Sequence, residues 1–162
     1  MMRSVQNEFS LSQERCILLL AEKFNVRKSA KAQTPLPSEN LKPSVGVPVD
    51  SAMCRQLLGA IPCVAVASRP CISHACSRLA QFSQDPRESH YKAAIRLVKH
   101  SLNTSSCSIC HRCNNETLKC MYKDFDAMHH NVAASADSSF LSCEKTGRSQ
   151  AGCVLFCGNA PV

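Results

Sequence analysis

Apolar residues recur at helical spacing soon after the start of the chain. Four of them occupy positions i, i+3, i+4 and i+7 and so share one face of a helix: Ile17, Leu20, Ala21 and Phe24. Ser12 precedes them, and its hydroxyl oxygen can accept a hydrogen bond from a first-turn amide. The pattern predicts a helix that is capped by Ser12 and ends near Phe24.

Prolines dominate the next stretch, residues 33–50. Pro35, Pro37, Pro43 and Pro48 lie in this stretch, which shows little apolar periodicity. Proline has no amide hydrogen and biases the residue before it away from helical geometry. The stretch is therefore predicted to be an extended connector.

The helical pattern returns near residue 51. Leu57, Leu58 and Ile61 would form the buried face of a second helix. Pro62 removes one helical hydrogen bond, so it either ends this helix or kinks a helix that continues; the sequence leaves both open.

A third helix is predicted over residues 71–82. Pro70 suits its first turn, because the fixed backbone of proline matches helical geometry and the missing amide is not needed there. Its apolar residues are Ile72, Cys76, Leu79 and Ala80.

A fourth helix follows almost at once. Asp85 is the predicted N-cap, with Pro86 in the first turn and Glu88 reaching back to the cap amide. The apolar face comprises Tyr91, Ala94, Ile95, Val98 and Leu102. Arg96, Lys99 and His100 point away from it, where a solvated surface is the simplest interpretation.

The last third of the chain has no helical period. Short strands are predicted at residues 118–122, 131–137 and 151–157, with a turn at Gly158-Asn159 after the third. The predicted fold class is therefore α+β, mainly helical to about residue 102 and followed by a partial β-hairpin sheet.

Composition and charge narrow the class of protein. The 162 residues are 44% apolar, which suffices for one domain or two small ones. The apolar runs are too short for a membrane span or a signal peptide, so an intracellular protein, cytoplasmic or nuclear, is expected, without a membrane partner. The formal charge is +7, and residues 51–104 carry seven Lys or Arg against two Asp or Glu. A basic surface of this kind suits phosphate contacts.

Twelve cysteines raise the question of a metal. Four of them could bind zinc tetrahedrally, with His111, His129 and His130 nearby: Cys107, Cys110, Cys113 and Cys120. The first three are one crowded triplet, whereas a zinc ribbon has two separated pairs, so unselected thiols are the preferred interpretation. Cysteine-histidine catalysis by Cys71 or Cys76 with His74 is also open, but Cys76 belongs to an apolar face.

Several blocks of sequence resemble one family when taken in order. They are LSQERCILLLAEKF with TPLPSENLKPS, then PVDSAMCRQLLGAI, then Arg69-Pro70, Arg78-Leu79, Phe82, Pro86, His90, Ala93-Ala94 and Arg96. Residues 137–140 and GRSQAGCVLFCGNAPV complete the series. Together they resemble the Pol polyprotein of copia-type retrotransposons, from the end of reverse transcriptase to the start of ribonuclease H. Cysteines that replace family tyrosines, such as Cys16 and Cys153, indicate accumulated substitution.

The resemblance implies four segments. They are a reverse transcriptase thumb-like helix at 1–32, the connector at 33–50, connection-like helices at 51–104 and a truncated ribonuclease H-like start at 105–162. Both activities of the family depend on clustered carboxylates that hold two magnesium ions.

The chain has no Asp-Asp pair for polymerisation. Asp137 corresponds to the first ribonuclease H carboxylate and magnesium ligand, while a less favoured register uses Asp124 and Asp126. The other carboxylates would follow residue 162, so the magnesium site is incomplete and the chain is not expected to be an enzyme by itself.

The expected function is weak, sequence-independent binding of RNA or DNA by a polyprotein fragment, alone or with other parts of Pol. Seven basic residues are the expected phosphate contacts: Arg27, Lys28, Lys31, Arg87, Lys92, Arg96 and Lys99. The alternatives are a coopted non-enzymatic interaction or zinc-binding protein, and a degenerate remnant that folds poorly. The sequence does not fix an oligomeric state.

Overall fold

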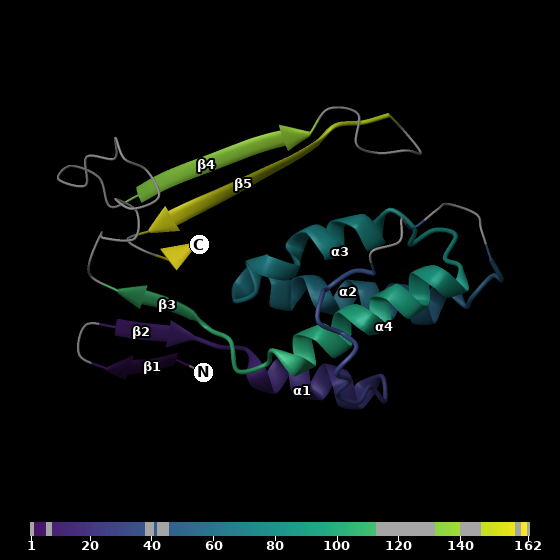
Figure 1. The fold of residues 1–162 in the computed structure, drawn as a ribbon, viewed down its shortest axis with the longest axis horizontal. Coiled ribbons are helices and arrows are strands. Elements are labelled where there is room, and N and C mark those ends of the chain that lie inside the picture. Colours follow the sequence, from purple (N-terminus) through teal and green to yellow (C-terminus); the bar gives the residue numbers. More distant parts are fainter. Residues whose placement is uncertain are drawn as a thin grey trace. The chain divides into compact units, whose positions relative to one another are not determined.

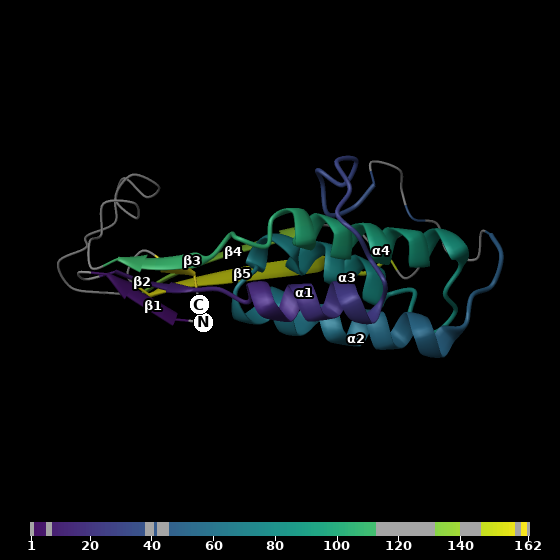
Figure 2. The same cartoon turned by 90° about the horizontal axis from the view of Figure 1, so that it is seen from below.

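The computed structural model describes residues 2–5, 8–37, 41, 46–112, 132–139, 147–157 and 160–161. It divides the chain into a helical unit, Ser12–Ser108, and a strand unit, Met1–Leu11 with Ile109–Val162. Figures 1 and 2 show these elements from two directions. The mixture of helices and antiparallel sheets confirms the α+β class.

The helical unit contains each of the four predicted helices. They are α1 (Glu14–Lys23), α2 (Ser51–Ala67), α3 (Ser73–Ala80), which a 3-10 turn at Pro70–Ile72 precedes, and α4 (Glu88–Asn103). Helix α2 continues past Pro62, which decides between the two outcomes that the sequence left open. No helix or strand interrupts the described part of the connector, 33–37, 41 and 46–50.

Helix α1 ends in a Schellman motif. Asn25 has a left-handed φ of 51° and donates its amide to the Glu22 carbonyl at 3.0 Å. The Val26 amide donates to the Ala21 carbonyl at 2.7 Å, and both residues belong to the core. At the other end the predicted cap is wrong, because Gln13 and not Ser12 is the N-cap. The hydroxyl of Ser12 still accepts a hydrogen bond from the Glu14 amide at 3.3 Å.

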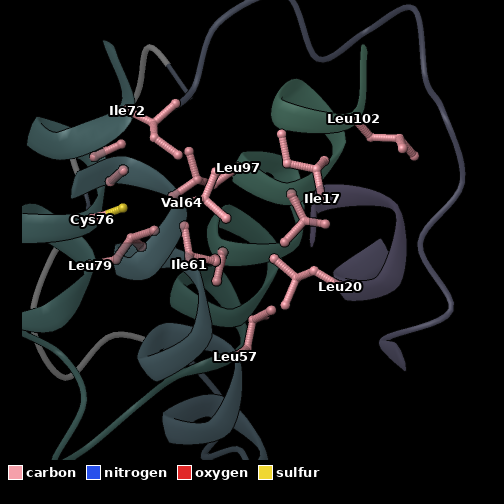
Figure 3. Packing of buried hydrophobic residues seen from close by; sticks show 14 of the residues in the cluster. Ile17, Leu20, Leu57, Ile61, Val64, Ile72, Cys76, Leu79, Leu97 and Leu102 are labelled. Carbon is pink, nitrogen blue, oxygen red and sulfur yellow. The ribbon is translucent and has the colours of Figure 1, made fainter. Parts of the chain in front are cut away.

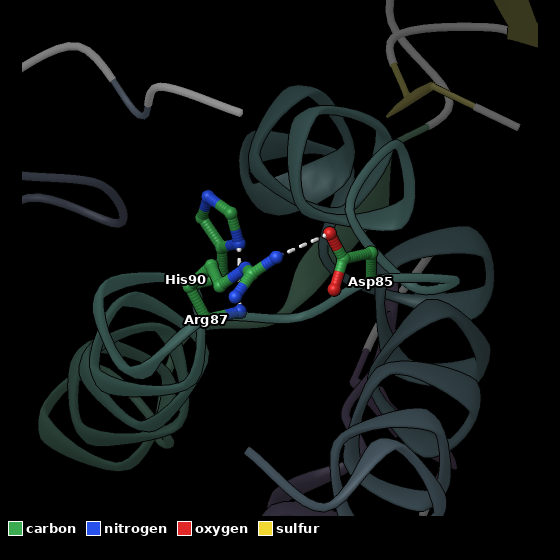
Figure 4. A network of polar contacts seen from close by, with 3 residues as sticks. All are labelled: Asp85, Arg87 and His90. Atoms are coloured by element: carbon green, nitrogen blue, oxygen red, sulfur yellow. Dashed lines mark hydrogen bonds and ion pairs between the residues drawn. The ribbon is translucent and has the colours of Figure 1, made fainter. Parts of the chain in front are cut away.

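The predicted cap of α4 is wrong, because Arg87 and not Asp85 is the N-cap. The Arg87 amide donates to Nδ1 of His90 at 3.1 Å, so a buried imidazole does what was expected of Glu88 (Figure 4). His90 is 1% exposed and stacks on Phe82, with the ring centroids 4.0 Å apart. Asp85 instead accepts a hydrogen bond from the Arg87 guanidinium at 2.8 Å.

The hydrophobic core gathers around α4. Side chains of α1, α2, the 3-10 turn, α3 and α4 meet in one cluster, and Figure 3 shows Ile17, Ile61, Val64 and Leu97 converging within it. On α4 itself six apolar or small side chains are buried: Ala93, Ala94, Leu97, Val98, Ser101 and Leu102. Tyr91 and Ile95 are only partly buried and pack against the cluster. Helix α4 is therefore covered over more of its surface than the predicted face alone.

The buried face of α3 differs from the predicted one at a single residue. Cys76 and Leu79 are buried as predicted, but Ala80 is exposed and Ala75 is buried in its place. Ala75 lies three residues after Ile72, and Ala80 lies eight residues after it, at the edge of a helical face.

Arg69 is 3% exposed and closes the C-terminal end of α4. Its guanidinium donates to the carbonyl of Thr104 at 2.7 Å and to Oγ1 of Thr104 at 2.6 Å. A cation is favourable at this end of a helix, because the last carbonyls have no partner within the helix and the macrodipole is negative there. Arg69 therefore connects the turn after α2 to the end of α4.

The strand unit consists of two antiparallel sheets. One contains β1 (Met2–Val5), β2 (Glu8–Leu11) and β3 (Ile109–Arg112); the other contains β4 (Val132–Ser139), β5 (Gln150–Cys157) and β6 (Ala160–Pro161). Strands β4 and β5 confirm two predicted strands and pair with each other. Residues 118–122 lie outside the described residues, and β1 to β3 were not predicted, because four residues are too few to show an alternating pattern.

Buried apolar side chains are confined to the helical unit in the part of the chain that the structure describes. On β5, Val154 and Leu155 are 39% and 47% exposed. Among the described helices, none combines the length and the apolarity that crossing a bilayer requires. Because the buried apolar side chains lie in the helical unit, core substitutions there test the stability of that unit.

Replacing Leu97 with alanine should lower the free energy of unfolding by about 2–5 kcal/mol, because the side chain is fully buried and leaves a cavity. Leu19→Ala is the matched control, since Leu19 also lies on a helix but is 55% exposed; its effect should stay within about 0.5 kcal/mol. Urea denaturation followed by circular dichroism measures both. Equal losses in the two variants would contradict this core.

Candidate nucleic-acid interface

A strap, defined as residues 27–36, follows α1 and runs along α4. Its first anchor is a pair of hydrogen bonds between Ser29 and Asn103, in which the Ser29 amide donates to Oδ1 at 3.3 Å and Nδ2 donates to the Ser29 carbonyl at 2.7 Å. One side chain thus satisfies both backbone groups of Ser29, which holds the start of the strap at the end of α4.

Two further side chains of α4 hold the rest of the strap. Nδ1 of His100 lies 3.2 Å from the Ala32 carbonyl, to which it can donate. Arg96 donates from Nε to the Thr34 carbonyl at 3.2 Å and from its terminal nitrogen to Oγ1 of Thr34 at 3.0 Å. Residues 96, 100 and 103 are spaced i, i+4 and i+7 and so form one stripe along α4.

The strap changes the interpretation of the polar side of α4. Arg96 and His100 do point away from the predicted apolar face, but they bind the backbone of the strap and are only partly exposed. A simple solvated surface is therefore wrong for these two side chains, because a distant segment of the chain covers them.

The strap brings two separately predicted groups of cations together. Arg27 and Lys28 from the strap and Lys99 from α4 line the same hollow, and Lys31 follows in the exposed part of the strap. None of these four side chains forms a hydrogen bond or an ion pair with another described residue. Their charges are therefore available to a polyanion. We call these four residues the basic surface.

The other predicted phosphate contacts have partners within the protein. Arg87 pairs with Asp85 at 2.8 Å, and Lys92 pairs with Glu88 at 2.7 Å across one turn of α4. Lys92 is exposed, so its pair is weak and can exchange for a phosphate, whereas Arg87 is half-buried. The structure places Arg96 in the strap contact and keeps only Lys99 of this group beside Arg27 and Lys28.

The two units differ in formal net charge. The helical unit contains thirteen Lys or Arg and six Asp or Glu, so it carries the whole formal charge of +7, and the strand unit is neutral. A polyanion would therefore be attracted to the helical unit.

Asp137 does not form a magnesium site with the residues that the structure describes. It lies on β4 opposite Gly152, is exposed, and accepts a hydrogen bond from the amide of Ser138 at 2.8 Å. Within the described ranges no group of three or more His, Cys, Asp or Glu side chains is placed to hold a metal ion. Asp124 and Asp126, the less favoured register, lie outside those ranges.

The zinc prediction is only partly covered by the structure. Cys107 and Cys110 are exposed, while Cys113 and Cys120 lie outside the described residues together with His129 and His130. Zinc binding by the four cysteines therefore stays a prediction.

Two cysteines of the helical unit are buried. Burial raises the pKa of the Cys54 thiol and raises that of Cys76 to about 11, because a thiolate loses its hydration in the core. A nucleophilic cysteine requires the opposite shift, so the structure argues against catalysis by Cys76.

No known protein family matches the chain, and neither a curated protein nor a solved structure matches it.

Sequence reasoning found the basic residues but missed what arranges them. Ser29, Ala32 and Thr34 contribute mainly backbone groups, which have no signature in the sequence. A local signal for the start of the strap was present at Asn25 but was not used. Asparagine just after a helical pattern often ends the helix in a left-handed turn.

Cys54 and Cys76 should react with a thiol reagent at pH 8 far more slowly than the exposed Cys16, Cys63 and Cys71 in the native protein. The thiolate is the reactive form, and burial both suppresses it and blocks access. Mass spectrometry of the labelled protein measures each site, with urea-unfolded protein as the control in which all five should react alike.

The same burial predicts a loss of stability at alkaline pH. The Cys76 pKa is higher in the folded protein than its usual 9.0, so the folded state retains this proton longer than the unfolded state does. The stabilising contribution is complete below pH 9 and is lost as the pH rises to about 11. Cys76→Ala should show a smaller fall in melting temperature over this interval, and an unchanged fall would be evidence against a buried thiol.

Proposed function

We propose that the helical unit is a non-enzymatic scaffold that binds RNA or DNA through phosphate contacts, without reading the base sequence. The observation that carries this proposal is the strap along α4, which gathers the four cations of the basic surface. Their charges meet no partner among the described residues, and the unit around them is strongly basic. Lysine and arginine side chains bind phosphate oxygens of any sequence alike.

The packing of the unit supports a folded scaffold over a poorly folding remnant. The core is continuous from α1 to α4, and side chains close both ends of α4: His90 of α4 itself at the start, and Arg69 from the turn after α2 at the end. Such a unit can present its cations at fixed positions, which reduces the entropy lost on binding.

We further propose that the chain is a fragment of a copia-type Pol polyprotein from the region between reverse transcriptase and ribonuclease H, inactive by itself. The order and spacing of the sequence blocks support this origin. The β4–β5 hairpin is compatible with the start of a ribonuclease H domain, and a role beside RNA or DNA would follow from it. Sequencing the adjoining DNA tests the origin: an unrelated reading frame on both sides would sink it.

Charge reversal on the basic surface should weaken the binding of a labelled oligonucleotide at least about tenfold. The variant R27E/K28E/K99E places three carboxylates where phosphates would bind, and each lost phosphate contact also flattens the dependence of log K on log salt by about 0.7–0.9. Fluorescence anisotropy over a salt series measures both the affinity and the slope.

The matched control carries the same change in net charge elsewhere on the helical unit. R15E/R55E/R78E alters side chains of α1, α2 and α3 that do not line the hollow, and its affinity should stay within about threefold of the native value. Equal weakening in the two variants would mean that only total charge matters, and binding that does not fall with salt would rule out phosphate contacts.

A further inference from the structure

An open hollow of about 440 Å³ lies between the end of α1, the strap and α4. Its lining has two chemical characters. Arg27, Lys28 and Lys99 provide three positive charges, and Phe24, Val26 and Ile95 provide apolar surface. The described residues that line it include no carboxylate, and the remaining two, Asn25 and Ser29, are neutral.

The wall of the hollow is held in place before any ligand binds. The Schellman motif fixes Asn25 and Val26 at the end of α1, and Asn103 holds both backbone groups of Ser29. Phe24 and Ile95 are partly buried and pack against the core, so one side of each is fixed while another side lines the hollow. A preformed site loses little entropy when it is filled.

The lining specifies an anion that has an apolar part. A metal cation would be repelled by the three charges, and inorganic phosphate would leave the apolar wall in contact with water. The volume lies within the roughly 300–1,000 Å³ that small-molecule sites usually have. A nucleotide combines the two characters, because its phosphate is anionic and its base is flat and largely apolar on both faces.

We propose that the hollow holds one nucleotide unit, with its phosphate at Arg27, Lys28 and Lys99 and its base against Phe24 and Ile95. This inference rests on the proposed nucleic-acid binding and deepens it, because it predicts a preference for single strands. The bases of a duplex are stacked and paired and cannot enter a hollow, whereas an unpaired base can rest on an aromatic or apolar wall. A free mononucleotide offers the same chemistry, so the test separates the two sources.

The experiment uses the full chain labelled with ¹⁵N and four probes: adenosine monophosphate, inorganic phosphate, a single-stranded oligonucleotide of about twelve nucleotides and a duplex of the same length. Amide signals of residues 24–29 and 95–99 should move with the mononucleotide and with the single strand, at concentrations where inorganic phosphate has no effect. The single strand should bind about tenfold more tightly than the duplex, as expected when one base is stacked or buried.

Two kinds of variant separate the role of the apolar wall of the hollow from the role of its cations. Phe24→Leu removes the ring but keeps an apolar side chain, and it should weaken single-strand binding more than duplex binding. Ile95→Thr keeps the branched shape and should act in the same direction, which provides a second test if one variant is unstable. K28M/K99M should weaken both ligands, and thermal melting confirms that each variant is folded.

The outcomes distinguish this inference from the function on which it rests. Equal affinity for single strand and duplex, both weakened by K28M/K99M, would overturn the nucleotide site and leave phosphate binding intact. Shifts with adenosine monophosphate but no preference for single strands would overturn the assignment to a strand. Absence of binding to every oligonucleotide would overturn the proposed function itself.

Discussion

The burial of α4 is the constraint on which the rest of the helical unit depends. Ala94, Leu97 and Val98 are completely buried, and α1, α2 and α3 all pack against this helix. A helix placed in this way must also satisfy its free backbone groups at both ends. His90 and Arg69 do so from buried positions, which explains why these two polar side chains are buried beside the apolar core.

The position of the strap follows from the position of α4. Once the apolar residues of α4 face the core, residues 96, 100 and 103 form a polar stripe on its remaining side, and the chain leaving α1 passes over it. The strap is fixed through its backbone, so its own lysine and arginine side chains are left to face outward. Packing inside the unit thus determines where these cations lie, and the basic surface is a consequence of the fold.

Local patterns were sufficient for the helices and insufficient for the surface. Each helix was predicted because its apolar period, prolines and end signals lie within a few turns of one another. The His90 cap was missed because an imidazole acceptor at that position is uncommon, and the strap was missed because its hydrogen bonds join residues more than sixty positions apart. Asp137 stays a prediction, because its role comes from the resemblance alone and the described residues place no metal-binding group around it.

Native-state hydrogen exchange tests most directly whether a helical unit organised by α4 is the folded part of this chain. Amides of residues 93–98 should exchange only through global unfolding, and Leu97→Ala should lower their protection by the same free energy as it lowers overall stability. Amides of the exposed β4–β5 hairpin should exchange much faster and should not respond to that substitution. Fast exchange throughout α4, or protection of the hairpin equal to that of α4, would contradict the account.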